Sequence, residues 1–166
     1  MTSTQHEQPG FGGRGEYLVA IQFALMIGFA LLPVWHPGIG AGILDASWGW
    51  RVAGALALGL VSLAFGALGS HHIRDYLTPL PYPVDHSQLV QHGVYGIVRH
   101  PLYASLLLAG LAWTLYNLSL SHLIALGFCF AFFDYKAGKE EAWLTQRHPE
   151  YVGYARRVKK FLPWIY

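Results

Sequence analysis

The stretch HGVYGIVRHPLY, which ends at Tyr103, places an arginine and a histidine–proline pair directly before a long uncharged segment. Pro101 suits the first position of a helix, because the N–H group that proline lacks would have no partner there. The residue before a proline avoids helical angles, so His100 is expected to end the preceding loop. The amino end of the helix has free N–H groups and the positive end of the helix dipole, and Arg99 adds a permanent positive charge. This stretch therefore predicts a place where an anionic group binds.

The uncharged segment that follows is predicted to form a helical hairpin. No Asp, Glu, Lys or Arg lies between His100 and Phe133. A single helix of that length would be much longer than the roughly 30 Å thickness of a bilayer core. We therefore predict two antiparallel spans, 102–116 and 119 to 136 or beyond, joined near Asn117.

The second arm of this hairpin brings acidic residues back to the first motif. At about 1.5 Å per residue, the descending helix returns to the level of Arg99 and His100 at about Glu140. Lys136 lies one turn earlier on the same face. Successive helical residues point about 100° apart, so Glu140 rather than Glu141 is expected to face the site. The two motifs are thus predicted to form one site with a basic half and an acidic half.

Two further hydrophobic segments precede these motifs. Residues 17–35 carry no formal charge and are long enough to cross a bilayer. A cleaved signal peptide is the alternative, but the weakly basic flank and the lack of a small-x-small cleavage site disfavour it. We expect a loop over 36–50, ending in Trp48 and Trp50 at the membrane interface, and then a second span over 51–70. In that span the small pairs Ala55–Gly59 and Ser62–Gly66 would allow another helix to approach closely.

Three polar segments flank the predicted spans: a loose glycine-rich tail over 1–16, a proline-rich loop over 71–101 and a basic, amphipathic tail over 137–166. In a four-span arrangement these segments share one side. Together with Lys136 they hold ten of the eleven lysines and arginines, and only Arg51 falls on the other side. The positive-inside rule therefore places both termini and the HGVYGIVRHPLY stretch in the cytoplasm.

The composition agrees with a membrane protein. Of the 166 residues, 54% are hydrophobic and 12% are charged, about half the charged fraction usual in soluble domains. We expect an all-α integral membrane protein with about four transmembrane helices, a C-terminal helical hairpin and a cytoplasmic amphipathic tail, in which 17–166 form a single domain. The one cysteine, Cys129, excludes a disulfide framework and a CxxC site.

Two other ligand classes are not expected. The nine histidines, among them the adjacent His71 and His72, form no HExxH or repeated i, i+4 pattern, so we expect no metal site. The basic run ARRVKK over 155–160 could suggest nucleic acid, but beside a membrane it is expected to meet anionic lipid.

A ligand with both anionic and cationic groups would suit the predicted site. S-adenosylmethionine carries a carboxylate, an ammonium and a sulfonium, and its adenine would pack against walls such as Tyr95 and Tyr103. On physical grounds alone, a nucleotide or a phospholipid head group would suit the site equally well.

The motifs narrow this choice by resemblance. The pattern G-x-Y-x-x-x-R-H-P-x-Y is present as GVYGIVRHPLY, followed by EEAWL and then by YVGYARRVKKFLP. Together these motifs resemble the isoprenylcysteine carboxyl methyltransferase family, and more loosely the related phospholipid methyltransferases. The resemblance covers residues 87–163, and the N-terminal half matches only as hydrophobic spans.

What the resemblance implies is an integral-membrane methyltransferase that uses S-adenosylmethionine. The family motif assigns cofactor contacts before the G-x-Y, at its tyrosine, in the H-P-x-Y stretch and at the first glutamate of the pair. With Arg99, which the helix-start argument adds, the expected cofactor-binding residues are Gln88, Leu89, Val90, Tyr95, Arg99, His100, Pro101, Leu102, Tyr103 and Glu140. Ser87 aligns as well, but the family often has a histidine there, and here the histidine is His86.

The acceptor is left open. Lys136 stands where the prenylcysteine enzymes have an arginine that meets the substrate, so we expect Lys136 to bind substrate or to reach the head groups. A lysine does not give the bidentate recognition of a carboxylate that an arginine gives. The acceptor is therefore expected to be a prenylcysteine-like carboxylate, a lipid or a small hydrophobic molecule. In-line displacement requires mainly positioning of the two partners, and no general base is assigned, although Glu140 or Glu141 could deprotonate an amine acceptor.

Two alternatives from other classes remain. Membrane reductases of the sterol-reductase type resemble this family in a related arginine–histidine–tyrosine stretch and use NADPH, but they are longer, and EEAWL favours the methyltransferase. A non-enzymatic membrane scaffold or a small transporter subunit would bind neither cofactor.

Overall fold

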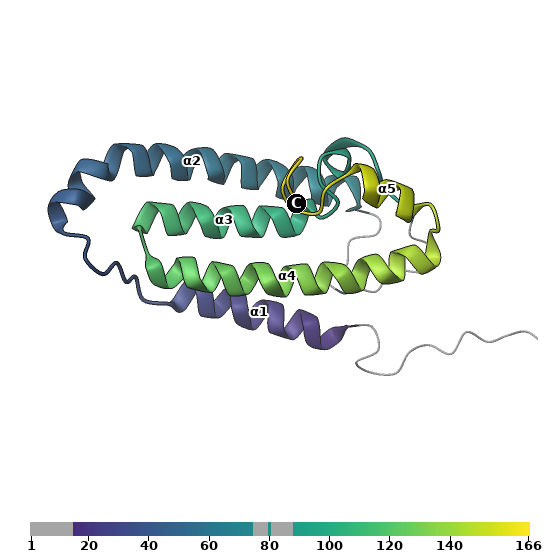
Figure 1. Cartoon of the computed structure of the whole chain (residues 1–166), viewed down its shortest axis with the longest axis horizontal. Coiled ribbons are helices and arrows are strands. Elements are labelled where there is room, and N and C mark those ends of the chain that lie inside the picture. Colours follow the sequence, from purple (N-terminus) through teal and green to yellow (C-terminus); the bar gives the residue numbers. More distant parts are fainter. Residues whose placement is uncertain (1–14, 75–79, 81–87) are drawn as a thin grey trace, which may run out of the picture.

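The computed structural model describes residues 15–74, 80 and 88–166, and this part of the chain is all-helical (Figure 1). It contains no strand within these ranges, and its one isolated β-bridge joins Val98 to Lys159. The elements are α1 (Glu16–Leu31), α2 (Ala41–His72), the 3-10 turn η2 (Gly93–Gly96), α3 (Pro101–Asn117), α4 (Leu120–Arg147) and α5 (Tyr151–Arg157). The predicted all-α class is confirmed.

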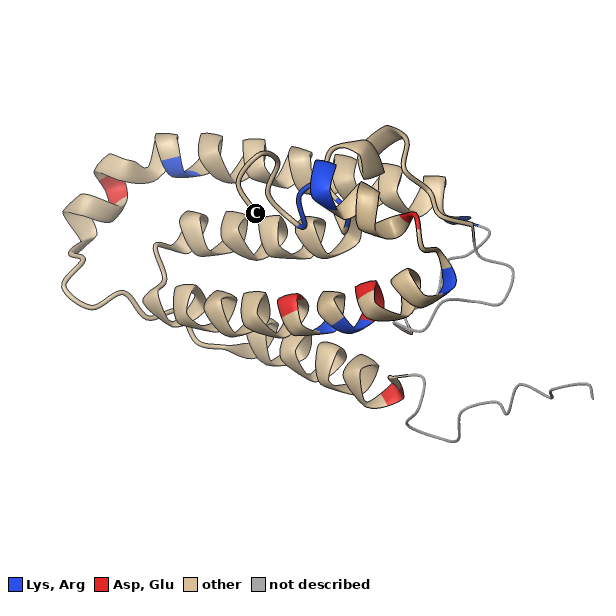
Figure 2. Ribbon diagram, turned by 45° about the vertical axis from the view of Figure 1, so that its right-hand side comes forward, with Lys and Arg blue, Asp and Glu red and all other residues tan. Residues whose placement is uncertain are grey.

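The four longer helices lie side by side in the order α2, α3, α4, α1, and α5 lies at the end where α4 finishes (Figure 1). Two of them, α2 and α4, are long and apolar enough to cross a membrane, and α1 is a shorter apolar helix. Most of the described charged residues gather toward the α5 end of the molecule (Figure 2). One end of the bundle is thus polar, and its middle is apolar.

The first half of the chain departs from the predicted boundaries. The helix α1 ends at Leu31 rather than at 35, because Leu32 precedes Pro33 and takes extended angles. The helix α2 begins at Ala41 rather than at 51, so only 36–40 of the predicted loop over 36–50 lie outside helices, and Trp48 lies within the helix, as does Trp50.

Arg51, at the predicted start of the second span, lies inside α2 because its charge is satisfied within the protein. Its side chain is buried, and its guanidinium donates hydrogen bonds to the carbonyl oxygens of Leu44 and Tyr116. Arg51 therefore links α2 to the carboxyl end of α3, where a cation also complements the helix dipole.

The predicted hairpin of the last two long helices is confirmed. Pro101 is the first residue of α3, and His100 precedes it with non-helical angles. The helix α3 ends at Asn117, and Leu118 adopts a left-handed conformation with φ 46°. Ser119 then caps α4, because its hydroxyl accepts a hydrogen bond from the N–H of His122.

The C-terminal tail, predicted only to be amphipathic, begins as a continuation of α4. The helix α4 continues through 137–147, where Ala, Glu, Trp and Leu favour a helix and no proline occurs before Pro149. After α5, residues 158–166 turn back toward the start of α3, and we call them the C-terminal strap.

One of the two predicted small-residue pairs packs a helix interface. The Ser62 hydroxyl donates a 2.7 Å hydrogen bond to the carbonyl of Ser105 in α3, and a Cβ at Gly66 would lie 3.4 Å from the Ser105 hydroxyl. A Cβ at Gly59 would meet nothing within 4 Å, so the pair that includes Gly59 does not form a close contact.

Several predictions fall outside the described residues. These are the loose tail over 1–14, His86 and Ser87, and most of the proline-rich part of the 71–101 loop.

Candidate functional site

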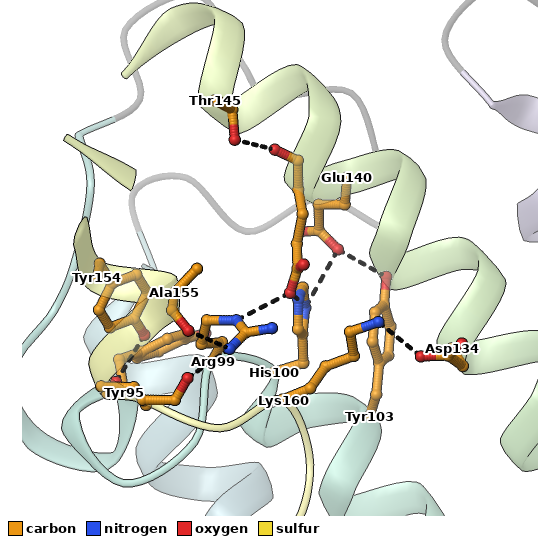
Figure 3. A network of polar contacts seen from close by, with 12 residues as sticks. Tyr95, Arg99, His100, Tyr103, Asp134, Glu140, Thr145, Tyr154, Ala155 and Lys160 are labelled. Atoms are coloured by element: carbon orange, nitrogen blue, oxygen red, sulfur yellow. Dashed lines mark hydrogen bonds and ion pairs between the residues drawn. The ribbon is translucent and has the colours of Figure 1, made fainter. Parts of the chain in front are cut away.

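His100 is the centre of a polar cluster at the charged end of the bundle (Figure 3). Its Nε2 lies 2.9 Å from Oε1 of Glu141, and its Nδ1 lies 3.5 Å from Oε2 of Glu140. The return of Glu140 to the level of His100, predicted from helix rise, is confirmed. Burial lowers the pKa of His100, but hydrogen bonds and charge from the two glutamates outweigh burial, so that its pKa is raised above the ordinary value.

Both glutamates face the cluster, although the sequence predicted that only Glu140 would. His100 offers one ring nitrogen to each carboxylate, and Arg99 approaches Glu141 as well, with Nε 2.9 Å from its Oε1. Glu140 and Glu141 point about 100° apart, and both still reach the cluster because His100 contacts both of them and Arg99 contacts Glu141. This arrangement places Glu141 against Arg99 and leaves the Glu140 carboxylate the more exposed of the two, at 28% against 18%.

Tyr103 connects the polar cluster to the apolar interior. Its hydroxyl donates a 3.2 Å hydrogen bond to Oε2 of Glu140. One side of its ring stacks on His100, with ring centroids 5.5 Å apart, and it also stacks on Phe133 at 5.1 Å. Tyr103 thus has its hydroxyl at a carboxylate and its ring in an aromatic stack.

Arg99 joins three parts of the chain. Besides Glu141 in α4, its guanidinium donates to the carbonyl oxygens of Ala155 and Val158, at the end of α5 (Figure 3). The predicted positive charge beside the helix start is present, but in this structure its hydrogen bonds are used within the protein.

The C-terminal strap holds the loop that carries Arg99 and His100. The N–H of Arg99 donates to the carbonyl of Lys159 at 2.8 Å, and that of His100 donates to Lys160 at 3.1 Å. Phe161 is almost completely buried, and its ring meets that of His100 edge-on at 6.0 Å. The sequence prediction treated this segment only as an amphipathic tail. The phenylalanine in KKFLP was the available signal of a buried contact.

A group of buried tyrosines borders the cluster. The Tyr95 hydroxyl lies 3.5 Å from the carbonyl of Gly69, and the Tyr154 hydroxyl donates a 2.6 Å hydrogen bond to the carbonyl of Tyr95. Burial raises the pKa of Tyr95, and the charge of Glu140 raises it further. The Tyr151 hydroxyl is buried beside the Arg99 guanidinium, and it makes no hydrogen bond of ordinary geometry with the residues described. Tyr151 and Tyr154 were not predicted as site residues, although they form the Y-x-x-Y part of the motif.

The other predicted cofactor residues lie around this cluster. Gln88, Leu89 and Val90 precede η2 in irregular backbone, with Gln88 exposed and the other two half-buried. Pro101 and Leu102 pack toward α2, because a Cβ at Gly69 would lie 3.2 Å and 3.1 Å from their side chains.

Lys136 points into the protein. Its side chain is only 1% exposed, its Nζ donates a 2.5 Å hydrogen bond to Oε1 of Gln22 in α1, and it lies 5.4 Å from the centre of the Tyr103 ring. The alternative that Lys136 extends to the lipid head groups is therefore wrong.

An apolar cavity of about 220 Å³ lies between α1, α3 and α4. Its lining includes Phe29 from α1, Gly110 from α3, and Cys129 and Phe133 from α4. Phe133 also stacks on Tyr103, so this one ring lies between the cavity and the polar cluster. Among the described residues, no group of three or more His, Cys, Asp and Glu side chains is placed to hold a metal ion.

Comparisons with known proteins give one distant similarity. The nickel-cobalt-cadmium resistance protein NccN of Alcaligenes xylosoxydans xylosoxydans is 27% identical over 116 residues, which are 69% of this chain and 52% of that protein. The chain thus spans about half the length of the curated relative that it matches. No family model matches the chain, and no solved structure matches it.

Proposed function

We propose that this protein transfers a methyl group from S-adenosylmethionine to a lipophilic acceptor at the cytoplasmic face of a membrane. The observation that carries the proposal is the meeting of His100, Tyr103 and Glu140 beside an apolar cavity. These residues come from the two motifs that resemble the isoprenylcysteine carboxyl methyltransferase family. The polar cluster would hold the cofactor and the apolar cavity would hold the acceptor, and Phe133 lies between them. This arrangement would suit methyl transfer from a polar donor to an acceptor dissolved in the membrane.

The residues present suit the cofactor. When bound, S-adenosylmethionine supplies an electrophilic methyl group on its sulfonium. Glu140 keeps part of its carboxylate exposed and takes one hydrogen bond from Tyr103, so it has acceptor capacity for an ammonium or hydroxyl group.

Within the site, the chain's own groups have separate tasks. Glu141 and Arg99 hold the loop before α3 against α4 and α5, and they leave Glu140 to contact ligand. Tyr103 orients the Glu140 carboxylate and separates the polar cluster from the cavity. This division of tasks fits a reaction in which positioning supplies much of the rate enhancement.

The cavity and Lys136 favour an acceptor with an apolar part. The lining is apolar and lies among helices that we place in the bilayer. Lys136 puts one cationic donor near Tyr103, which suits an acceptor with a single anionic or polar atom better than a carboxylate held at two points.

We infer four membrane spans, α1 to α4, with both termini and the polar cluster on the cytoplasmic side. The helices α2 and α4 have the length and composition for this. With 16 and 17 residues, α1 and α3 would reach about 24–26 Å and would require local thinning of the bilayer or anchoring by flanking residues.

A transfer assay tests the proposed reaction. Purified protein is incubated with S-adenosylmethionine labelled in the methyl group and with total membrane lipids, and the products are extracted and identified. We expect label in an apolar product with the wild type and with Asp45→Asn, a control for a carboxylate at the other end of α2, and little with Glu140→Gln. Transfer that survives Glu140→Gln, or reduction of the lipid fraction by NADPH in place of methylation, would contradict the proposal.

A second candidate is a role in resistance to nickel, cobalt or cadmium, which the similarity to NccN favours. Growth of cells that express the chain in graded concentrations of each metal salt tests it. Protection that persists in Glu140→Gln would favour this candidate over methyl transfer, whereas unchanged sensitivity in cells with the wild-type chain would contradict it.

A further inference from the structure

The end of the C-terminal strap exposes a set of apolar side chains. Trp164 is 91% exposed and Ile165 is 77% exposed, and Leu162 is also exposed. We call these three residues the strap tip. The turn that carries them is closed by hydrogen bonds from the N–H groups of Phe161 and Leu162 to the carbonyl of Tyr166. The strap is therefore a folded structure that holds apolar groups outward.

The backbone at Trp164 supports this conclusion. Its φ is 62°, in the left-handed region that large side chains seldom adopt. Phe161, three residues earlier in the chain, turns inward and is buried. A strained turn that buries one aromatic ring and extends another away from the protein indicates a use for the exposed ring.

Contacts with α4 fix the depth of the strap. Lys160 Nζ lies 2.6 Å from Oδ1 of Asp134, and the Tyr166 hydroxyl lies 2.9 Å from the same atom. Asp134 precedes Glu140 by six residues, or about 9 Å along the helix, toward the apolar half of α4. The chain end accordingly lies beside the start of α3 rather than beyond α5 (Figure 1). The strap is thus attached on the side of the polar cluster that faces the apolar half of α4, where we place the membrane.

Exposed positive charges lie on the strap and on the helix before it. Arg156, Arg157 and Lys159 are exposed, and only Arg157 has a side-chain bond in the structure described, a 3.3 Å contact to Gln91. The acidic groups on the strap's neighbours have other partners: Asp134 pairs with Lys160, Glu141 with Arg99, and Glu150 lies 3.5 Å from His148. Apolar side chains beside a set of available cations are the composition expected of a segment that lies at an anionic lipid surface.

We propose that the C-terminal strap is a membrane-interface anchor, which inserts Trp164 and Ile165 among lipid chains and sets Arg156, Arg157 and Lys159 against anionic head groups. The proposal rests on the placement of α2 and α4 in a bilayer and is independent of methyl transfer. Because the carbonyls of Lys159 and Lys160 hold the loop before α3, the anchor also fixes the polar cluster at the membrane surface.

Spin labels in reconstituted protein test the insertion. In a Cys129→Ala background, one label is placed by Ile165→Cys, which keeps Trp164. Two references are Phe128→Cys, on an exposed apolar position of α4, and Arg147→Cys, at its exposed polar end. The measurement is the ratio of collision with oxygen to collision with a water-soluble nickel chelate. We expect the ratio at 165 to be several-fold above that at 147 and near that at 128.

A ratio at 165 equal to that at 147, with a high ratio at 128, would overturn the anchor while leaving the spans intact. A low ratio at 128 as well would overturn the membrane placement on which it depends. Because neither outcome involves the cofactor, failure here is distinguishable from failure of the proposed function.

The lipid preference has its own test. The label at 165 is compared in vesicles of phosphatidylcholine and in vesicles that also contain anionic phosphatidylglycerol, for the native sequence and for a combined Arg156→Gln, Arg157→Gln and Lys159→Gln variant. We expect the ratio at 165 to rise with anionic lipid in the native sequence and to lose that rise in the variant, whereas Lys139→Gln, another exposed basic position, should keep it. An identical response in the native sequence and the triple variant would overturn the proposed head-group contact.

Discussion

The hydroxyl of Tyr103 lies 3.2 Å from Oε2 of Glu140, and this contact joins the first turn of α3 to the later part of α4. The two residues are 37 positions apart in the sequence. Their meeting makes one site from two motifs, and it depends on the turn at Leu118 that reverses the chain between the helices.

The two neighbouring glutamates should respond differently to loss of charge. In Glu141→Gln, Arg99 loses its only carboxylate partner among the described residues, and its largely buried charge keeps only the carbonyl oxygens of Ala155 and Val158 as partners. We expect a loss of about 2–3 kcal/mol in the free energy of unfolding. Glu140 is more exposed, so Glu140→Gln should lower the free energy of unfolding by less, about 1 kcal/mol or below. Thermal unfolding in one detergent compares them, and equal losses would contradict the division of tasks between the pair.

His100 predicts a pH dependence of stability. Its pKa is raised in the folded protein, so its two carboxylate contacts contribute fully below its ordinary pKa of about 6.5 and are lost as the pH rises through the higher folded value. The stability difference between the wild type and His100→Gln should therefore shrink as the pH is raised above the ordinary pKa of about 6.5. Unfolding measured for both proteins across this range provides the check. A difference that grows with pH would mean that His100 is neutral in the folded state.

Removing the hydroxyl group from each of the two tyrosines of α5 should lower stability by different amounts. Tyr154→Phe removes a 2.6 Å hydrogen bond and leaves the carbonyl of Tyr95 without that donor, so we expect a loss of about 1 kcal/mol. Tyr151→Phe removes a buried hydroxyl that lies beside the Arg99 guanidinium without a hydrogen bond of ordinary geometry, so we expect a smaller loss than for Tyr154→Phe. Chemical unfolding of the two variants in parallel measures this, and a larger loss in Tyr151→Phe would contradict this order.

A glycine at the α2–α3 interface should be needed for close packing of the first turn of α3 against α2. A Cβ at Gly69 would lie 3.1–3.4 Å from Leu102 and Pro101, whereas one at Gly59 would meet nothing. Gly69→Leu is therefore expected to destabilise the protein by about 1–3 kcal/mol through overpacking and to displace the loop with His100. Gly59→Leu is the matched control and should leave the melting temperature near that of the wild type. Equal effects of both substitutions would contradict the packing described.

The sequence was sufficient to predict what local rules and helix length determine. Pro101 set the start of α3, the uncharged run required a reversal near Asn117, and the rise per residue placed Glu140 at the level of His100. These predictions held because each depends on backbone geometry that few other interactions override.

Other features depend on tertiary contacts that the sequence pattern does not reveal. The sequence predicts a helix boundary at Arg51, because the burial of this side chain against the carbonyls of Leu44 and Tyr116 cannot be read from composition. Glu141 was assigned away from the site, because the position of Arg99 beside α4 is set by α5 and by the C-terminal strap. The strap itself pairs with the loop before α3 mainly through backbone atoms, and Phe161 is the one side chain whose type hinted at a buried contact.

The central claim is that the cluster around Glu140 binds S-adenosylmethionine, and calorimetric titration of the detergent-purified protein with this cofactor tests it most directly. We predict the same dissociation constant for the wild type and Asp45→Asn, binding weakened by roughly tenfold or more in Glu140→Gln, and no heat on titration with NADPH. Absence of binding in the wild type, or a Glu140→Gln affinity equal to that of the wild type, would contradict the claim.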